Sequence, residues 1–175
     1  MKKENLQNVK LRTGLVSSID KTAIMENSVK NLVPSYYNLS GDKVESLSYN
    51  TEKARKNMIS AFDELKLDNL TINILCTTEY EEIAKSIISN WQTNIGVELN
   101  GTITVAEQDE YASKIRNGDF DIAIYNLTVD SDKSVNFLSM FKTGNENNVS
   151  GYSSEEFDRI IDDLSMSSTK EKAIY

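Results

Sequence analysis

The sequence predicts an α/β domain built on a mainly parallel sheet that is flanked by helices. Three strand-like segments, at 69–76, 97–105 and 120–125, are separated by two amphipathic helical segments. This alternation of strand and helix is typical of right-handed crossovers between parallel strands. Because 175 residues can bury one sizeable core, we expect residues 1–175 to form a single domain.

The chain before the sheet is predicted to form three helices with one interruption. The apolar residues of 15–19 follow helical spacing, and Asp20 can cap a second helix over 24–29. Residues 30–49 have no period and contain the only proline, so we expect an irregular crossing there. Asn50 then starts a helix whose apolar side consists of Ala54, Met58, Ala61, Phe62 and Leu65.

The sheet itself is predicted from alternation and helix signals. Every second residue from Leu70 to Cys76 is apolar, which is the period of a strand. Thr78 and Glu81 have the spacing of a capping box, and Gly96 ends the helix that follows. The apolar stripe of that helix includes Trp91, for which we expect a place in the core. A second strand covers 97–105, a short helix covers 109–117 with Gly118 as its cap, and a third strand covers 120–125.

The segment after the third strand is where a ligand site is expected. Residues 126–134 have no hydrophobic period, and ligands of parallel sheets usually bind beyond the carboxyl ends of the strands. A short helix is predicted to start at Ser134. Ser153 and Glu156 have capping-box spacing before a last helix through Leu164.

Composition narrows the classes of function. The net charge of −8 would repel nucleic-acid phosphates, so no nucleic-acid partner is expected. The absence of histidine removes the commonest general base and metal ligand near neutral pH. The single cysteine, Cys76, is expected to be a small buried apolar residue. Residues 1–5 lack the apolar core of a signal peptide, so we expect any export signal or lipid anchor to lie outside this sequence.

The acids at 130 and 132 raise two further possibilities. The segment from Asp130 begins like a calcium loop, but Val135 and Phe141 occupy the positions of the required glycine and glutamate, so no metal site or other cofactor is expected. Catalysis by Asp130 and Asp132 as an acid and base pair is disfavoured, because neighbours on one loop rarely face a substrate from opposite sides. Asp130 can instead accept charge-assisted hydrogen bonds from a ligand ammonium group.

Several motifs, taken in order, resemble one known family. The run GDFDIA at 118–123 is followed by Asp130, by Phe137 and Leu138, and by NNVSGY at 147–152. Residues 8–21 and 50–54 resemble the family's "VRxRxAL…AIDR" and "DPEKA" segments. In this order they resemble the second, C-terminal lobe of the peptide-binding receptors of ABC importers, family 5 of the extracellular solute-binding proteins.

The resemblance implies a lobe of the type II periplasmic-binding-protein fold, cut from a longer chain at both ends. It implies a non-catalytic protein that captures extracellular oligopeptides between two lobes and delivers them to ABC permease subunits. Asp130 would then pair with the peptide amino terminus, and the backbone of Asn126, Leu127 and Thr128 would bind the peptide main chain. Asn148 or Tyr152 would support the loop. The missing N-terminal lobe would complete the site.

The resemblance also implies a location and leaves alternatives open. A Gram-positive parent would carry the receptor as a cell-surface lipoprotein, and a Gram-negative parent would keep it in the periplasm. Leu127, Ser131 and Ser134 replace a tryptophan, a tyrosine and a proline of the family pattern. A nickel chelate, a sugar or another small solute therefore remains an alternative ligand. A docking domain and a hydrolase remain further alternatives from other classes.

Overall fold

The computed structural model describes residues 4–28, 48–125 and 134–172. The chain divides into two compact units, Met1–Tyr125 and Asn126–Tyr175, and each is described by itself below. The expectation that residues 1–175 form one domain stays a prediction.

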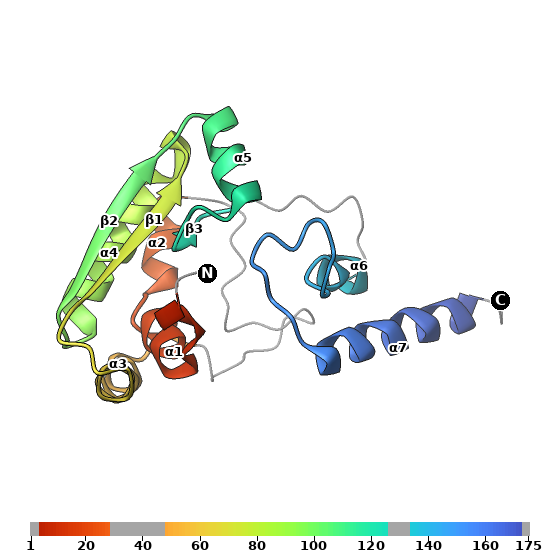
Figure 1. The fold of residues 1–175 in the computed structure, drawn as a ribbon, viewed down its shortest axis with the longest axis horizontal. Helices are drawn as coiled ribbons and strands as arrows, with labels where there is room; N and C mark the ends of the chain where they lie inside the picture. Colours follow the sequence, from red (N-terminus) through yellow and green to blue (C-terminus); the bar gives the residue numbers. More distant parts are fainter. Residues whose placement is uncertain (1–3, 29–47, 126–133, 173–175) are drawn as a thin grey trace. The chain divides into compact units, whose positions relative to one another are not determined.

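A parallel sheet forms the centre of the first unit. Its strands are β1 (Leu70–Cys76), β2 (Leu99–Val105) and β3 (Ile122–Ala123), in the order β2-β1-β3 (Figure 1). β1 pairs with β2 along its whole length, from Leu70 opposite Leu99 to Cys76 opposite Val105. β3 pairs with β1 at only two positions. The predicted α/β class with a parallel sheet and flanking helices is confirmed.

Helices surround this sheet, and short polar side chains or glycines mark several of their ends. The helical elements are the 3₁₀ turns η1 (Glu4–Gln7) and η3 (Thr78–Tyr80) and the helices α1 (Val9–Ser17), α2 (Lys21–Ser28), α3 (Thr51–Leu65), α4 (Glu81–Asn94) and α5 (Gln108–Asn117). The predicted cap at Asn50 is present, because its side chain accepts a 2.8 Å hydrogen bond from the Lys53 amide. Asp20 caps α2 through a 3.2 Å bond from the Ala23 amide. Gly96 and Gly118 adopt φ of 72° and 68°, as expected for glycines that end helices.

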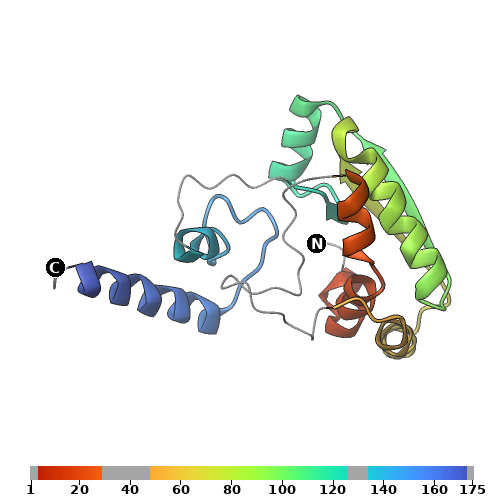
Figure 2. The same cartoon turned by 180° about the vertical axis from the view of Figure 1, so that it is seen from behind.

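The hydrophobic core lies on the face of the sheet that α4 crosses (Figure 2). Ile72, Ile74 and Cys76 point to this face and are fully buried. Trp91 of α4 is also buried, and its indole Nε1 donates a 3.3 Å hydrogen bond to the Leu15 carbonyl, which confirms its predicted core role. Burial raises the pKa of the Cys76 thiol, so this cysteine behaves as an apolar core residue.

Two glycines allow close approach of core elements. An ideal Cβ on Gly14 of α1 would lie 2.6 Å from both Cγ and Sδ of Met58 on α3. An ideal Cβ on Gly101 of β2 would lie 2.6 Å from Cγ1 of Ile88 on α4. The lack of a side chain therefore sets the spacing of α1 against α3 and of α4 against β2.

Two predictions about the sheet region are corrected by the structure. Thr78 and Glu81 do not form a capping box, because Thr78 begins the turn η3 and no side chain caps either η3 or α4. The third strand is shorter than the predicted 120–125. The side chain of Asp121 accepts a 3.0 Å hydrogen bond from the Asn73 amide, so a carboxylate takes the place of a ladder carbonyl before Ile122.

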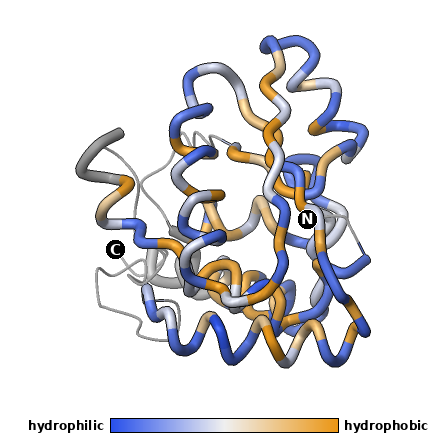
Figure 3. The backbone as a smooth tube through the Cα atoms, turned by 90° about the vertical axis from the view of Figure 1, so that its left-hand side faces the viewer, coloured by the Kyte–Doolittle hydropathy of each residue, from blue (hydrophilic) through white to orange (hydrophobic). Residues whose placement is uncertain are grey.

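The second unit contains the described helices α6 (Ser134–Ser139) and α7 (Glu155–Lys172). α7 is amphipathic, and its Ile161 is buried. Figure 3 shows hydrophobic and hydrophilic residues interspersed along the backbone of the described residues. The predicted cap at Ser153 is wrong by one residue. Ser154 Oγ accepts the 3.2 Å hydrogen bond from the Phe157 amide, whereas Ser153 Oγ is 3.2 Å from Thr143 Oγ1.

Candidate functional site

Four of the six predicted ligand residues lie outside the part of the chain that the structure describes. These are Asn126, Leu127, Thr128 and Asp130, within the segment 126–133. The other two, Asn148 and Tyr152, lie in the second unit, in the turns between α6 and α7.

Asn148 organises these turns with its side-chain amide. Its Nδ2 donates to the carbonyls of Phe141 and Lys142 at 3.1 Å each and to the carbonyl of Tyr152 at 2.7 Å. Its Oδ1 accepts a 2.8 Å hydrogen bond from Ser150 Oγ. Only an amide offers both donors and an acceptor in this geometry. The side chain thus ties both ends of 141–152 together.

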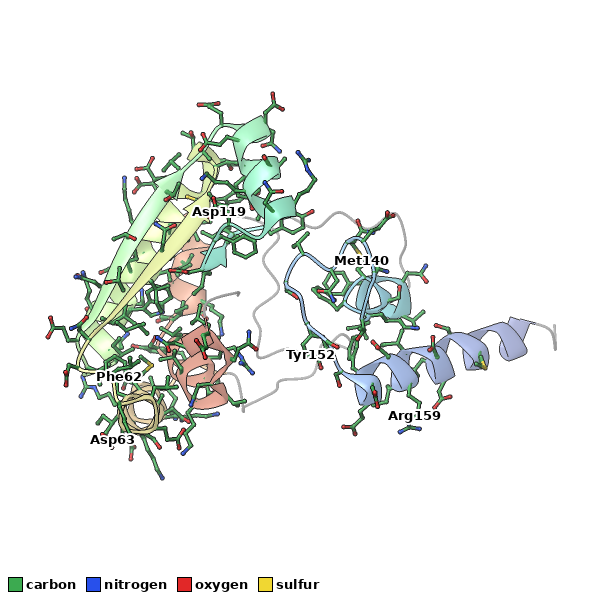
Figure 4. All side chains as sticks on the ribbon, in the orientation of Figure 1. Phe62, Asp63, Asp119, Met140, Tyr152 and Arg159 are labelled. Carbon is green, nitrogen blue, oxygen red and sulfur yellow. The ribbon has the colours of Figure 1, made fainter. Side chains whose placement is uncertain are left out.

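Tyr152 presents an exposed aromatic surface beside this loop. Its side chain is 48% exposed, and its ring makes an edge-to-face contact with Phe157, with ring centroids 5.4 Å apart. Figure 4 shows Tyr152 near the start of α7. The backbone amide of Tyr152 donates to Ser150 Oγ at 3.2 Å, so the same turn that Asn148 closes also positions this ring. An aromatic ring held in this way can pack against a ligand side chain.

Asp158 of α7 closes the loop from the other side. Its Oδ1 accepts a 3.0 Å hydrogen bond from the Thr143 amide. Hydrogen bonds from the Thr143 side chain and backbone lower the pKa of this carboxyl. Lys142 also forms an ion pair with Asp162. The loop is therefore fixed to α7 by polar contacts as well as by the ring of Tyr152.

The first unit has a hollow of about 380 Å³ on the face of the sheet opposite the core. Its walls are formed by β1, β2, α5 and the turn into β3, through Asn73, Leu75, Thr104, Lys114, Gly118, Asp119, Phe120 and Asp121. The alternation of a strand explains this lining. Asn73 and Leu75 are the residues of β1 that point away from Ile72 and Ile74.

Charges of both signs lie on the wall of this hollow. Lys114 Nζ is 3.4 Å from Asp119 Oδ2 and 3.7 Å from Glu110 Oε1. Figure 4 labels Asp119 at the end of α5, where it is largely exposed. The GDFD motif at 118–121, which was predicted to precede the cleft loop, therefore lines this hollow. The sequence did not predict the hollow, because its walls come from α5 and β1, which are distant in sequence.

The described residues support neither a metal site nor a membrane span. Among residues 4–28, 48–125 and 134–172, no three metal-ligating side chains come together. Within the same ranges, no helix is sufficiently long and apolar to span a bilayer.

Comparison with known proteins identifies similarity to bacterial solute-binding proteins. The family model described as "Bacterial extracellular solute-binding proteins, family 5 Middle" matches residues 1–149. The oligopeptide-binding protein OppA of Bacillus subtilis (strain 168) is 24% identical over 185 residues, which cover 95% of this chain and 33% of OppA. The chain therefore spans one third of the length of this curated relative.

Solved structures show the same fold. A crystal structure of a peptide-binding protein of a peptide ABC transporter superposes with a TM-score of 0.76 at 22% identity, covering 92% of this chain and 79% of that one. Listeria monocytogenes OppA bound to peptide superposes with a TM-score of 0.75 at 21% identity, covering 91% of this chain and 35% of that one. The shared fold is of the type II periplasmic-binding-protein class.

Proposed function

Because this chain belongs to the family 5 bacterial extracellular solute-binding proteins, we propose that it is the second lobe of a receptor that captures oligopeptides for an ABC importer. The single observation that carries this proposal is the family match over residues 1–149. The similarity to an oligopeptide-binding protein over 95% of the chain supports peptides as the ligand class.

In this proposal the ligand lies in a cleft between this lobe and an N-terminal lobe of the same receptor. The carboxylate of Asp130 accepts hydrogen bonds from the peptide ammonium, and charge assistance makes these bonds strong in a site that excludes water. Backbone groups of Asn126, Leu127 and Thr128 bind the peptide main chain, so that recognition does not depend on the peptide side chains.

Asn148 and Tyr152 have supporting roles. The Asn148 amide already donates to the carbonyls of Phe141, Lys142 and Tyr152, which suits a residue that holds a loop in shape. The exposed ring of Tyr152 is available to a ligand side chain. Neither residue needs to perform chemistry, and the receptor is proposed to act by binding alone.

Membership of this family also suggests where the receptor is located and how it delivers its ligand. The family is extracellular by its description. We infer that the loaded receptor docks on ABC permease subunits and that a lipid anchor elsewhere in the receptor holds it at the surface of a Gram-positive cell. In a Gram-negative cell the receptor would instead be retained in the periplasm.

The ligand class is tested by calorimetry on the two-lobed receptor. A mixed pool of oligopeptides is titrated in parallel with a pool of mono- and disaccharides and with a nickel chelate. The proposal predicts saturable heat with peptides alone. Binding of sugars or of the nickel chelate, with no response to peptides, would reject peptides as the ligand class while leaving the family assignment intact.

A further inference from the structure

We propose that the outer edge of β2 is a self-pairing edge, at which a second copy of this chain adds its own β2 in antiparallel orientation. This inference is independent of the proposed function, because it rests on the sheet alone. In the described sheet β2 is a terminal strand, with β1 on one side only (Figure 1). A terminal strand carries backbone donors and acceptors that can pair with another strand.

The hydrogen bonds of the sheet identify the backbone groups that point outward. The Glu98 carbonyl accepts from the Leu70 amide at 3.0 Å, and the Ala106 amide donates to the Cys76 carbonyl at 3.0 Å. Even-numbered residues of this segment therefore face β1. Backbone groups alternate in direction along a strand, so the amides and carbonyls of Leu99, Gly101, Ile103 and Val105 point to the free edge.

The sequence of β2 lacks the features that usually prevent a terminal strand from pairing with another chain. Residues 99–105 contain no charged residue and no proline. The pairing with β1 runs through all seven positions without a bulge. Asn100, Thr102 and Val105 are exposed. Natural terminal strands are commonly protected by lysine, proline or a bulge, and within the described sheet β2 has none of these three protections.

One register makes the strand complementary to itself. A twofold axis through Thr102 places Leu99 opposite Val105 of the second copy, and Gly101 opposite Ile103. All of these residues carry outward backbone groups, so each such pair exchanges two hydrogen bonds, about eight bonds in total. Closed dimers with twofold symmetry use the same surface on both copies, as this pairing does.

The side chains suit the same register on both faces of the sheet. On the polar face, Thr102 meets Thr102 of the second copy at a position without mutual hydrogen bonds, where side chains approach most closely. Asn100 meets Thr104 there. On the core face, Ile103 of each copy lies opposite Gly101 of the other, and Ile88 of α4 already packs over that glycine, with its Cγ1 2.6 Å from the position of an ideal Cβ. Threonine pairs and β-branched side chains stabilise such cross-strand contacts.

Charge makes the pairing weak and dependent on salt. Each copy has a net charge of −8, and in this register Glu98 lies opposite Ala106 of the second copy, next to Glu107. Like charges at both ends of the paired strands oppose association, and salt screens them. A single pair of edges also buries less area than the roughly 1,200 Å² of a standard specific interface. We therefore expect a concentration-dependent dimer that added salt strengthens.

A cysteine scan of the full 175-residue chain tests the register. Two residues opposite each other without mutual hydrogen bonds have Cα atoms about 4.5 Å apart, within disulfide range. Thr102→Cys should form a covalent dimer under mild oxidation at least about tenfold faster than Asn100→Cys, whose equivalent faces Thr104 instead. The native Cys76 is buried and does not compete. Equal rates for the two variants would overturn the register.

Charge swapping at the same position tests the dimer without cross-linking. Thr102→Lys and Thr102→Glu should each stay monomeric in sedimentation at about 1 mM, and an equimolar mixture should associate, because opposite charges then face each other. Unchanged Trp91 fluorescence shows that each variant is folded. A wild-type chain that stays monomeric at this concentration in high salt overturns the proposal. The proposal is also overturned if the amide resonances of Gly101 and Ile103 shift when an oligopeptide is added and do not shift when the protein concentration is raised.

Discussion

Replacement of Gly14 by alanine should destabilise the first unit, although alanine is the better helix former. The change adds one methyl group at the crossing of α1 and α3. Its Cβ would lie 2.6 Å from Cγ and Sδ of Met58 and 3.2 Å from the carbonyl oxygen of Ala54. Favourable carbon contacts are about 3.5–4.0 Å, so Met58 must move by about 1 Å.

Two opposing terms decide the magnitude. Alanine in place of a helical glycine contributes about 1 kcal/mol of stability. Overpacking a core costs about 1–3 kcal/mol, and the upper part of this range applies because Met58 is fully buried and the Ala54 carbonyl belongs to a helix backbone. The net effect is a loss of about 2 kcal/mol in the free energy of unfolding, or about 4–8 °C in Tm.

The assay is urea unfolding followed by the fluorescence of Trp91, the single tryptophan, which is buried in the core of the same unit. Thr13→Ala, on the same helix, is the control for helix propensity. In the background of Met58→Ala the cost of Gly14→Ala should shrink by about 1–2 kcal/mol, because the clashing atoms are gone. A Gly14→Ala variant as stable as the wild type, or a cost unchanged by Met58→Ala, would refute the close approach of these helices.

Two further predictions concern single groups. Burial raises the pKa of Tyr111 to about 12, and its hydroxyl donates a 2.5 Å hydrogen bond to the Ile124 carbonyl. The unfolded chain ionises this phenol first, near pH 10, so the free energy of unfolding should fall from about pH 10 to about pH 12. In urea titrations Tyr111→Phe should flatten that decline, whereas Tyr152→Phe, at an exposed position, should leave it unchanged. Equal effects of the two variants would contradict the assignment of the decline to Tyr111. Ser154→Ala should lower the stability of α7 by about 1 kcal/mol through loss of its cap, whereas Ser153→Ala should have a smaller effect. Amide exchange at the start of α7 measures both variants, and the reverse order would restore the cap predicted at Ser153.

The local sequence predicted most of the first unit because its signals are local. The alternation from Leu70 to Cys76 and the caps at Asn50 and Gly118 depend on near neighbours and appear in the structure as expected. The limits of β3 depend on a distant contact. Asp121 binds the amide of Asn73, 48 residues away, and no periodicity contains that information.

The site was less predictable for the same reason. The role of Asn148 depends on three carbonyls that converge on one amide, and the sequence indicated only a residue that could support a loop. The hollow beside Asp119 exists because α5 and β1 lie next to each other in space. The shift of the α7 cap from Ser153 to Ser154 shows that two adjacent serines cannot be told apart by spacing alone.

This lobe is proposed to anchor a peptide by its amino terminus at Asp130, and one calorimetric experiment tests that proposal most directly. The two-lobed receptor is titrated with an oligopeptide and with its N-acetylated form, as wild type, Asp130→Asn and Asp132→Asn. Loss of a buried charged partner costs about 2–5 kcal/mol, so acetylation and Asp130→Asn should each weaken binding by about 30-fold or more. Asp132→Asn, with the same charge change two residues away, should bind like the wild type. Equal binding of the two peptide forms, or equal losses in the two variants, would contradict the account.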